Sequence, residues 1–510
     1  MEERIVGLET EYGLSVKMAD GSFVHPPYAG KYFLEPLEGL LAEQKNHRHP
    51  FLEKAGIVRI VGEKLVSGPT FRFWIAASGG KLYRDTIGPA DILEYATPEC
   101  ITIRDLVRAE QGGDRLVYEL SKILFPIGEN ASSVVITRTN WDAINGNSLS
   151  EIKHWGNHEN YQVKDDFLSV YAMRGRGSAY LMKLLNTLLV TRIVLTGLGG
   201  LLYDRTNTTW RYVVSPRAFS SRLPLFTFRG GKIGNHSGDS HDCPEGFARL
   251  HVFSGDPLML PKATQIRFGL VSVFLRMCEA GVLEEYSLPV LEEPEKAFPF
   301  FSRDSSLRRR ASLYGKNVSW TAVQILREWA ECLSRFIESR RVEVPLEERQ
   351  IVERVLRLCD VAERDSFLLY PYADWMLKRT LLEQYCRKKK IDFGDSRARF
   401  FDVLYSDISP AGIYHRWRSA QKKSPLLFSE EEMDRTLLQH QAAPRAELRK
   451  KHLRALDRAG EGTRNEWGKF FSFPKKDFYL VRDPLCGTHT GIEEEIEYLK
   501  KTSEKKCADK

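Results

Sequence analysis

The 510-residue sequence lacks paired cysteines of the kind that bind metals or form redox disulfides. Its eight cysteines are scattered, with no CxxC pair and no spacing typical of metal ligands. Several of them, including Cys278, Cys332 and Cys359, fall in helical patterns where a free thiol acts as a small apolar residue. This cysteine usage favours a reducing, cytoplasmic compartment.

The sequence also lacks a signal peptide ahead of the first predicted strand and an uninterrupted apolar run that could span a membrane. Its most apolar stretch, residues 184–203, is broken by Arg192 and by the glycines Gly197, Gly199 and Gly200. We therefore expect a buried helix that ends at the glycines, and no membrane partner.

No internal repeat, low-complexity tract or GxxxxGK[ST] phosphate loop is present. An ATP site in this chain would therefore be built from metals and an arginine on a sheet. The formal charge is only +7, and its basic runs, such as 308–310, 388–390 and 449–451, are predicted to be solvated helix faces. Together these runs would also suit an acidic partner, either nucleic acid or acidic protein. The sequence has no nucleic-acid recognition motif or pattern of stacking aromatics, so we do not expect a nucleic-acid partner.

Length and pattern predict a large domain followed by a small one. We expect a catalytic domain over 1–424, in which 45–78 is an insertion or lid, and a small C-terminal domain over 425–510. The small domain contains a basic helix, residues 445–458, and a charged tail, 493–510, that we expect to fray. The periodicity elsewhere predicts helices over 31–44, 104–124 and 266–281 and strands over 4–16, 134–138 and 223–228.

Two carboxylates share one face of the first predicted strand. Glu9 and Glu11 lie two apart in GLETEYG, so their side chains point the same way while Val6 and Leu8 point the other way. Two adjacent carboxylates repel each other, which favours a hard cation such as Mg²⁺ between them. From the pair alone, two solvated glutamates on an edge strand remain the alternative.

Further titratable residues stand in polar segments along the chain. Asp85 in KLYRD and Glu94 in EYATPEC have apolar and aromatic neighbours, where carboxylates are paired with a cation or tuned for proton transfer. His158 lies in GNHENY, a glycine-bounded segment entering a strand, and could be structural or functional. Arg249 and His251 share one face of a predicted strand, which suits phosphate oxygens because arginine offers a planar fork of donors.

Taken together and in this order, these segments resemble the Pup ligase and depupylase family (PafA and Dop), carboxylate–amine enzymes related to glutamine synthetase. GLETEYG is similar to the family's opening strand, and KLYRD with EYATPEC is similar to its LYxD…EYxxPE segment. GNHENY resembles its HENY motif, and ARLHV followed by Gly255-Asp256 resembles its RRLHV…GD strand. The resemblance implies an α+β, glutamine-synthetase-like fold: a curved antiparallel sheet backed by helices.

The resemblance also implies the roles of individual residues. The family's catalytic aspartate matches Asp85. The ligands for Mg²⁺ and the ATP phosphates would be Glu9, Glu11, Glu94 and His158. Contacts to nucleotide or phosphate would come from Tyr83, Arg217, Arg249 and His251.

The implied activity is ATP- and Mg²⁺-dependent and acts on the C-terminal Glu or Gln of a small, acidic, Pup-like protein modifier. In a ligase, the modifier's glutamate is phosphorylated by ATP, and Asp85 helps to deprotonate the lysine of a target protein that attacks the acyl phosphate. In a depupylase or deamidase, the same site cleaves the isopeptide bond or deamidates a C-terminal Gln.

Details of the sequence lead us to expect the depupylase or deamidase. The stretch between the first strand and KLYRD is longer than is usual in the ligases, and the hydrolases carry an insertion there. The residues at 97–100 and 405–407 are also closer to those of the hydrolases. Residues 373–379 look more like a ligase, which is the alternative reading. An inactive ATP-dependent binding protein is the non-enzyme alternative, and the retained carboxylate cluster argues against it because such charges are costly to desolvate.

Overall fold

The chain forms two compact units that interleave in sequence. The computed structural model describes residues 4–18, 23–24, 31–43, 49–60, 64–65, 68–69, 72–87, 90–125, 131–139, 155–166, 177–204, 206–219, 225–229, 244–421, 442–459, 467, 469–472 and 477–508. The sheet unit comprises Arg4–Ile136, Arg229–Arg249 and Phe428–Lys510. The helical unit comprises Met1–Glu3, Thr137–Phe228 and Leu250–Leu427. Each unit is described by itself below.

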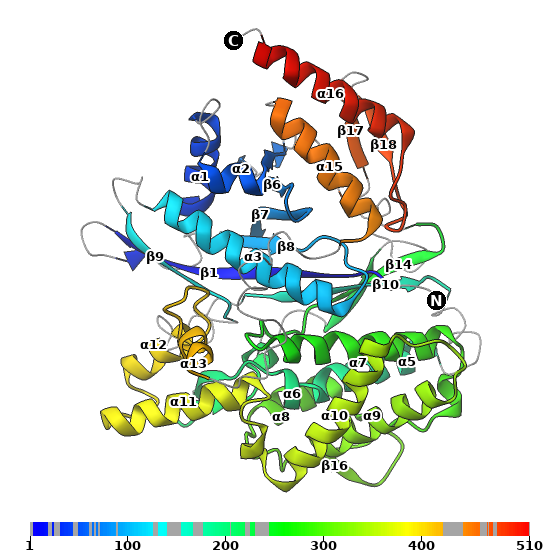
Figure 1. Cartoon of the computed structure of the whole chain (residues 1–510). Helices are drawn as coiled ribbons and strands as arrows, with labels where there is room; N and C mark the ends of the chain where they lie inside the picture. Colours follow the sequence, from blue (N-terminus) through cyan, green and yellow to red (C-terminus); the bar gives the residue numbers. More distant parts are fainter. Residues whose placement is uncertain are drawn as a thin grey trace. The chain divides into compact units, whose positions relative to one another are not determined.

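An antiparallel sheet forms the centre of the sheet unit (Figure 1). Its strands run in the order β1 (Val6–Met18), β8 (Ala90–Ala96), β7 (Gly80–Ile87), β6 (Arg72–Ile75) and β3 (Ile57–Arg59), and each neighbouring pair is antiparallel. The short strand β2 (Phe23–Val24) and β9 (Ala131–Thr137) also pair with β1, and β4 (Lys64–Leu65) pairs with β5 (Gly68–Pro69). Asp85 and Glu94 therefore lie on the adjacent strands β7 and β8.

One face of this sheet is covered by helices α1 (Lys31–Glu43) and α3 (Ile103–Leu124). Tyr12 and Tyr95 point toward this side, because the Tyr12 hydroxyl donates to Asp114 of α3 at 2.9 Å. A Cβ on Gly113 of α3 would come within 2.3 Å of the Tyr95 ring, so a glycine is needed for this close approach. Since neighbouring residues alternate along a strand, Glu9, Glu11 and their cross-strand partners point to the opposite face.

The C-terminal segment covers part of that opposite face, over β3 and β6. It consists of α15 (Pro444–Ala459), β17 (Lys469–Ser472), β18 (Asp477–Leu480) and α16 (Thr490–Ala508). Val58 and Trp74 from the sheet share a buried apolar cluster with Leu448, Leu453 and Phe470 from this segment. Whether residues 1–424 and 425–510 act as separate functional domains stays a prediction.

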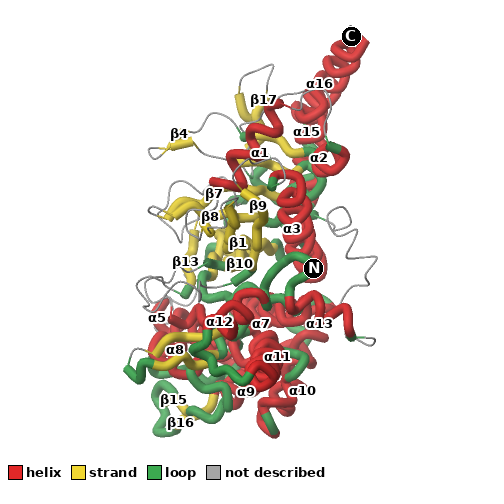
Figure 2. The backbone as a smooth tube through the Cα atoms, turned by 90° about the vertical axis from the view of Figure 1, so that its left-hand side faces the viewer, coloured by secondary structure: helices red, strands yellow, loops and turns green. Residues whose placement is uncertain are grey.

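The helical unit contains most of the helices downstream of residue 177 (red in Figure 2). Its strands β13 (Phe226–Arg229), β14 (Phe247–Val252, with residues in both units) and β10 (Asn157–Lys164) neighbour one another in that order. The helices are α5 (Gly177–Thr191), α6 (Ile193–Thr196), α7 (Pro261–Glu279), α8 (Pro294–Ser302), α9 (Ala322–Glu338), α10 (Leu346–Arg364), α11 (Asp374–Lys389), α12 (Ser396–Leu404) and α13 (Ile413–Ala420). Two hairpins complete the unit: β11 (Gly200–Asp204) with β12 (Thr209–Val213), and β15 (Arg310–Ser312) with β16 (Ser319–Thr321). Helix α7 is buried along nearly its whole length and packs against α9 and α10.

The predicted helices over 31–44, 104–124 and 266–281 are confirmed as α1, α3 and α7. The apolar stretch 184–203 is helical only to Thr196, and its last residues form strand β11. Within the described residues, the window Ala179–Thr196 is long and apolar enough to cross a membrane, but 78% of it is buried inside the protein. It is a core element, as its interrupting charge and glycines predict.

Two other expectations need correction or refinement. The tail does not fray over its described part: α16 extends to Ala508, and Ile492, Ile496 and Leu499 pack from one stripe into the apolar cluster. Spacings of four and three residues place these side chains on one helix face, a signal that the charged composition obscures. In the stretch 45–78, helix α2 (Pro50–Ala55) and strands β3 and β6 are part of the sheet unit; a role as a lid stays a prediction.

Candidate functional site

Three carboxylates gather on the sheet face that α1 and α3 leave uncovered. The strand register places Glu94 of β8 between Glu11 of β1 and Tyr83 of β7, and Asp85 lies two residues beyond Tyr83 on the same face. Ligand oxygens of Glu11, Asp85 and Glu94 all lie within 4.8 Å of one another. Glu11 and Glu94 are only 2% and 3% exposed. Oxygen ligands at this spacing suit a hard divalent cation.

Like charges surround Glu94. Burial raises its pKa well above the usual value, and the negative charges of Glu9, Glu11 and Asp85 raise it further. Burial likewise raises the pKa of Tyr83, and the charge of Glu94 and the hydrogen bond that Tyr83 donates to it act in the same direction. A cation at this position would relieve the repulsion and favour the ionised carboxylates.

Cationic side chains lie at the border of this acidic group. Nη1 of Arg249, on β14, is 3.7 Å from Oε1 of Glu9. Lys81 precedes Tyr83 by two residues on β7, and its Nζ lies 5.5 Å from the centre of the Tyr83 ring. Glu9 and Lys81 face Ala96 of β8 from its two neighbouring strands. Acidic and basic groups side by side can hold both a metal ion and the phosphates of a nucleotide.

Strand β10 presents His158 because its other face is anchored in the core. Its burial pattern alternates along Asn157–Lys164. The buried Glu159 accepts hydrogen bonds from Arg192 at 2.9 Å and 2.5 Å and from Tyr161 at 2.6 Å. Since adjacent residues point to opposite sides of a strand, this anchoring turns His158 the other way. The GNHENY motif therefore combines one functional candidate with a buried ion pair.

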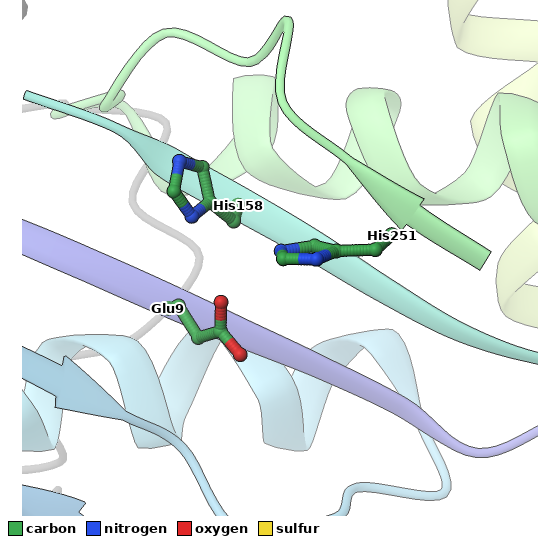
Figure 3. Close-up of side chains that lie close together, drawn as sticks. All are labelled: Glu9, His158 and His251. Atoms are coloured by element: carbon green, nitrogen blue, oxygen red, sulfur yellow. The ribbon is translucent and has the colours of Figure 1, made fainter. Parts of the chain in front are cut away.

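His158 and His251 stack edge to face in the helical unit, with their ring centres 5.3 Å apart. Figure 3 shows the two imidazoles on their strands and also draws Glu9 on β1. The Phe253 ring lies 4.3 Å from His251. A Cβ on Gly156 would come within 2.0 Å of His158 Nε2, so the glycine leaves room for the imidazole. Imidazole nitrogens can ligate a metal or donate to phosphate oxygens.

The side chain of Arg217 donates hydrogen bonds to two backbone carbonyls. It lies in the short 3₁₀ helix η1 (Pro216–Phe219), where its Nε donates to the carbonyl of Phe253 at 2.8 Å and its Nη1 to that of Trp155 at 3.4 Å. These bonds tie the segments that carry His158 and His251. The predicted contact of Arg217 with phosphate stays a prediction.

Six of the nine predicted site residues lie in the sheet unit and three in the helical unit. The sheet unit holds Glu9, Glu11, Tyr83, Asp85, Glu94 and Arg249, and the helical unit holds His158, Arg217 and His251. The sequence reading missed Lys81, although its two-residue spacing from Tyr83 and Asp85 indicates the same strand face. The His-rich patch near His49 gives no ligand in the described residues: His49 caps α2 by accepting from Phe51 N at 3.2 Å.

The antiparallel sheet backed by helices, with carboxylates on the face away from α1 and α3, defines an α+β protein of the glutamine-synthetase-like kind, as predicted. The same fold occurs in the crystal structure of the complex between the prokaryotic ubiquitin-like protein Pup and its ligase PafA, with a TM-score of 0.75 and 22% identity over 98% of this chain and 92% of that one. The Pup ligase PafA in complex with ADP matches with a TM-score of 0.70 and 21% identity over 91% of this chain and 94% of that one.

The chain belongs to the Pup-ligase family, whose model, described as Pup-ligase protein, matches residues 4–470. It is 28% identical to the Pup–protein ligase of Kineococcus radiotolerans over 98% of this chain and 100% of the relative. It is 26% identical to the Pup–protein ligase of Mycolicibacterium smegmatis over 92% of this chain and 93% of the relative. The resemblance drawn from the motifs is therefore confirmed.

Our main expectation of a depupylase or deamidase is contradicted, because these relatives are named as ligases. Two structural findings explain the error. Part of the long stretch between the first strand and KLYRD forms strands β3 and β6 of the sheet, so its length alone does not identify a hydrolase. In the segment 97–100, Glu99 forms hydrogen bonds with arginines of α15 inside the protein. The amino-acid sequence of this segment therefore reflects internal packing and does not identify the reaction.

Proposed function

We propose that this protein is an ATP- and Mg²⁺-dependent ligase that joins the C-terminal glutamate of a small, acidic, Pup-like modifier to lysine side chains of target proteins. The observation that carries the proposal is the group of three carboxylates, the buried Glu11 and Glu94 and the partly exposed Asp85, with ligand oxygens within 4.8 Å of one another. The family and the names of the relatives support the direction of the reaction, and a solved relative holds ADP.

The donor set fits Mg²⁺. Glu9, Glu11 and Glu94 offer the oxygen ligands that this ion prefers, and His158 completes the set that the family resemblance implies. The raised pKa of Glu94 indicates an environment that a cation would relieve. When bound, Mg²⁺ supplies positive charge that offsets the charge developing on the phosphates during transfer. Nucleotide and phosphate contacts are assigned to Tyr83, Arg217, Arg249 and His251.

The proposed reaction has two steps, and each is a nucleophilic displacement. The modifier's γ-carboxylate attacks the γ-phosphorus of ATP, which releases ADP and forms a γ-glutamyl phosphate. The ε-amine of a lysine then attacks the acyl carbon, the C–O bond to phosphate breaks, and an isopeptide bond forms. The amine must lose a proton to become a nucleophile, and we assign its removal to Asp85. Asp85 lies among the carboxylates and on the strand face of Tyr83, and it is the only partly exposed member of the group Glu11, Asp85 and Glu94.

We keep the division into a catalytic domain, residues 1–424 with a lid within 45–78, and a C-terminal domain, residues 425–510, as part of this proposal. The open carboxylate face belongs to the first of these, whereas α15 and α16 belong to the second.

The test is a conjugation assay read by mass spectrometry. The protein is incubated with Mg²⁺, ATP, a Pup peptide ending in Glu and a lysine-bearing acceptor protein. We expect a conjugate whose mass is the sum of the two partners minus one water, and ADP in equal amount. A reaction without ATP is the control. Release of the peptide from a preformed conjugate, with no conjugate formed from the Glu peptide, would overturn the proposal.

A further inference from the structure

Glu99, just beyond the end of β8, is enclosed by two arginines of α15. Arg445 donates to its Oε1 from Nε at 2.9 Å and from Nη2 at 2.7 Å. Arg449 donates to Oε1 at 3.2 Å and also to Oε2. The two arginine side chains are only 2% and 0% exposed. We call these three residues the Glu99 cluster.

The backbone around Glu99 connects the first strand to the C-terminal segment. The N–H of Ala443 donates to the Glu99 carbonyl at 2.7 Å. Two residues earlier, the N–H of Thr97 donates to the carbonyl of Leu8 at 2.9 Å, and Leu8 N–H donates to the Thr97 hydroxyl at 3.0 Å. Leu8 directly precedes Glu9 on β1. The segment that carries Glu99 therefore holds the part of β1 from which a proposed metal ligand projects.

On its other side, the Glu99 cluster fixes an aromatic pair. Arg449 Nη1 donates to the carbonyl of Trp467 at 2.7 Å. Its guanidinium lies 4.7 Å from the ring centre of Trp74 and 5.0 Å from that of Trp467, and the two indoles meet edge to face at 4.9 Å. The register sets Trp74 opposite Lys81, whose Nζ lies between the rings of Trp74 and Tyr83 at 5.6 Å and 5.5 Å. Arg449, Trp74, Lys81 and Tyr83 therefore form a row of successive contacts that reaches the carboxylate face.

The charges of the Glu99 cluster stay fixed. Burial acts to raise the pKa of Glu99, but the positive charges of Arg449 and Arg445 outweigh it, so the pKa is lowered. An ionised carboxylate held by two buried guanidinium groups has little freedom to move. Any movement of the carboxylate away from them would leave a charged group without its hydrogen bonds.

We propose that the Glu99 cluster is a positioning device for the nucleotide and metal site, and that Glu99, Arg445 and Arg449 are positioning residues. They contact no substrate. They fix the backbone at Glu99, just beyond the end of β8 and five residues after Glu94. They also hold Trp74 and Lys81 in place beside the carboxylate face. This inference rests on the proposed function, because it assumes that the face binds Mg²⁺ and a nucleotide.

A purely structural role is the competing explanation, since any buried ion cluster affects stability when broken. A matched control exists in the helical unit, where Arg276 of α7 binds Glu348 of α10 at 2.8 Å and 3.2 Å. Both of its side chains are buried. Glu348→Gln breaks a bidentate buried pair of the same chemistry, whereas Glu99→Gln breaks one that adjoins the carboxylate face.

The experiment is calorimetric titration of wild type, Glu99→Gln and Glu348→Gln with ADP in the presence and absence of Mg²⁺, at a temperature where each is folded. Both variants should lower the melting temperature. We expect Glu99→Gln to raise the dissociation constant for Mg²⁺–ADP by at least about tenfold, as loss of an outer-shell support does at metal sites. Glu348→Gln should change it by less than about twofold, because α7 and α10 carry none of the proposed ligands. Near-ultraviolet circular dichroism should report a changed Trp74 and Trp467 environment in Glu99→Gln alone.

If Glu99→Gln lowers the melting temperature but leaves Mg²⁺–ADP affinity within twofold of wild type, the positioning role is overturned. If it does not fold, Arg449→Lys takes its place: it keeps the positive charge but loses the planar fork of donors. We then expect a rise of about threefold in the dissociation constant, and an unchanged constant overturns the inference. Wild-type protein that binds no Mg²⁺–ADP would instead overturn the proposed function, whatever the variants do.

Discussion

Glu94 and Glu99 stand five residues apart in one segment of the sheet unit, and little of either is exposed, 3% of Glu94 and 10% of the Glu99 side chain. Their surroundings nevertheless have opposite charge. Burial and the like charges of Glu9, Glu11 and Asp85 raise the pKa of Glu94. For Glu99, two guanidinium groups outweigh burial and lower the pKa. The charge of Glu99 is neutralised by arginines of the same protein. Beside Glu94, by contrast, a cation bound from solution would be stabilised.

This contrast distinguishes a carboxylate that is neutralised by arginines from one that is surrounded by other carboxylates. A buried carboxylate held by arginines fixes the backbone and needs no further partner. A buried carboxylate among other carboxylates costs stability, which evolution tolerates chiefly at sites that bind or react. The following variants test that contrast, beginning with the largest expected effect.

Asp85→Asn removes the charge at the proposed reacting position. We expect conjugation to fall by at least about 10³-fold, because general base catalysis contributes that order of rate. Folding should stay near wild type, and any loss of Mg²⁺–ADP affinity should be far smaller than the loss of turnover, because Glu9, Glu11 and Glu94 are kept. Rates from the mass-spectrometric assay and affinities from calorimetry provide the measurement, and turnover close to wild type would remove Asp85 from its role.

Replacing each of the two contrasted glutamates by glutamine should change stability in opposite directions. In metal-free protein, Glu99→Gln should lower the free energy of unfolding by about 3–5 kcal/mol, because it leaves two buried guanidinium groups without their counter-charge. Glu94→Gln should raise it by roughly 1 kcal/mol, because it relieves repulsion among like charges. Urea denaturation in the presence of a chelator measures both. An equal loss of the free energy of unfolding in both variants would show that the two carboxylates do not differ in this way.

Asp374, the first residue of α11, provides a third kind of buried carboxylate, held by neutral donors. The Tyr405 hydroxyl donates to it at 2.7 Å and the Leu260 N–H at 3.0 Å. Burial raises its pKa from 3.8 to about 6, although these two bonds act to lower it. The folded state therefore holds a proton that the unfolded state has released, so this carboxyl makes the free energy of unfolding fall as pH rises from about 4 to about 6.

Asp374→Asn should remove this dependence. The difference in the free energy of unfolding between wild type and the variant should shift by about 3 kcal/mol between pH 4 and pH 7, in favour of the variant at the higher pH. Denaturation at a series of pH values measures this difference. A constant difference across the range would show that Asp374 does not titrate there.

The smallest effect is expected at Glu9, which lies beside Arg249 at the border of the acidic group. Glu9→Ala should weaken Mg²⁺-dependent ADP binding by about tenfold and leave any Mg²⁺-independent binding unchanged. Glu497→Ala, at an exposed glutamate of α16, is a suitable control. Equal affinities of the two variants in calorimetry would count against Glu9 as a metal ligand.

Local periodicity predicted much of this arrangement. The alternation in GLETEYG placed Glu9 and Glu11 on one face, and the register with Glu94 confirms that face. The adjacency of Asp85 and Glu94 was a prediction of the family resemblance, because strand order is not encoded in the spacing of any one segment. Roles of the individual residues stay predictions.

Other features depend on partners far away in sequence. The run 449–451 was predicted to be solvated, but Arg449 is fully buried against Glu99, 350 residues earlier. No local pattern shows such a partner. Residues 97–100 also take part in this long-range packing, and we had interpreted them as evidence for a hydrolase. The comparison with relatives corrects that prediction.

The central claim, that the carboxylate face around Glu94 binds a divalent cation, is tested most directly by electron paramagnetic resonance titration of Mn²⁺ with ADP. Wild-type protein and Glu348→Gln should remove Mn²⁺ from the free signal to the same saturating level. Glu94→Gln should need at least about tenfold more metal to do so. Indistinguishable Mn²⁺ binding by wild type and Glu94→Gln would contradict the account.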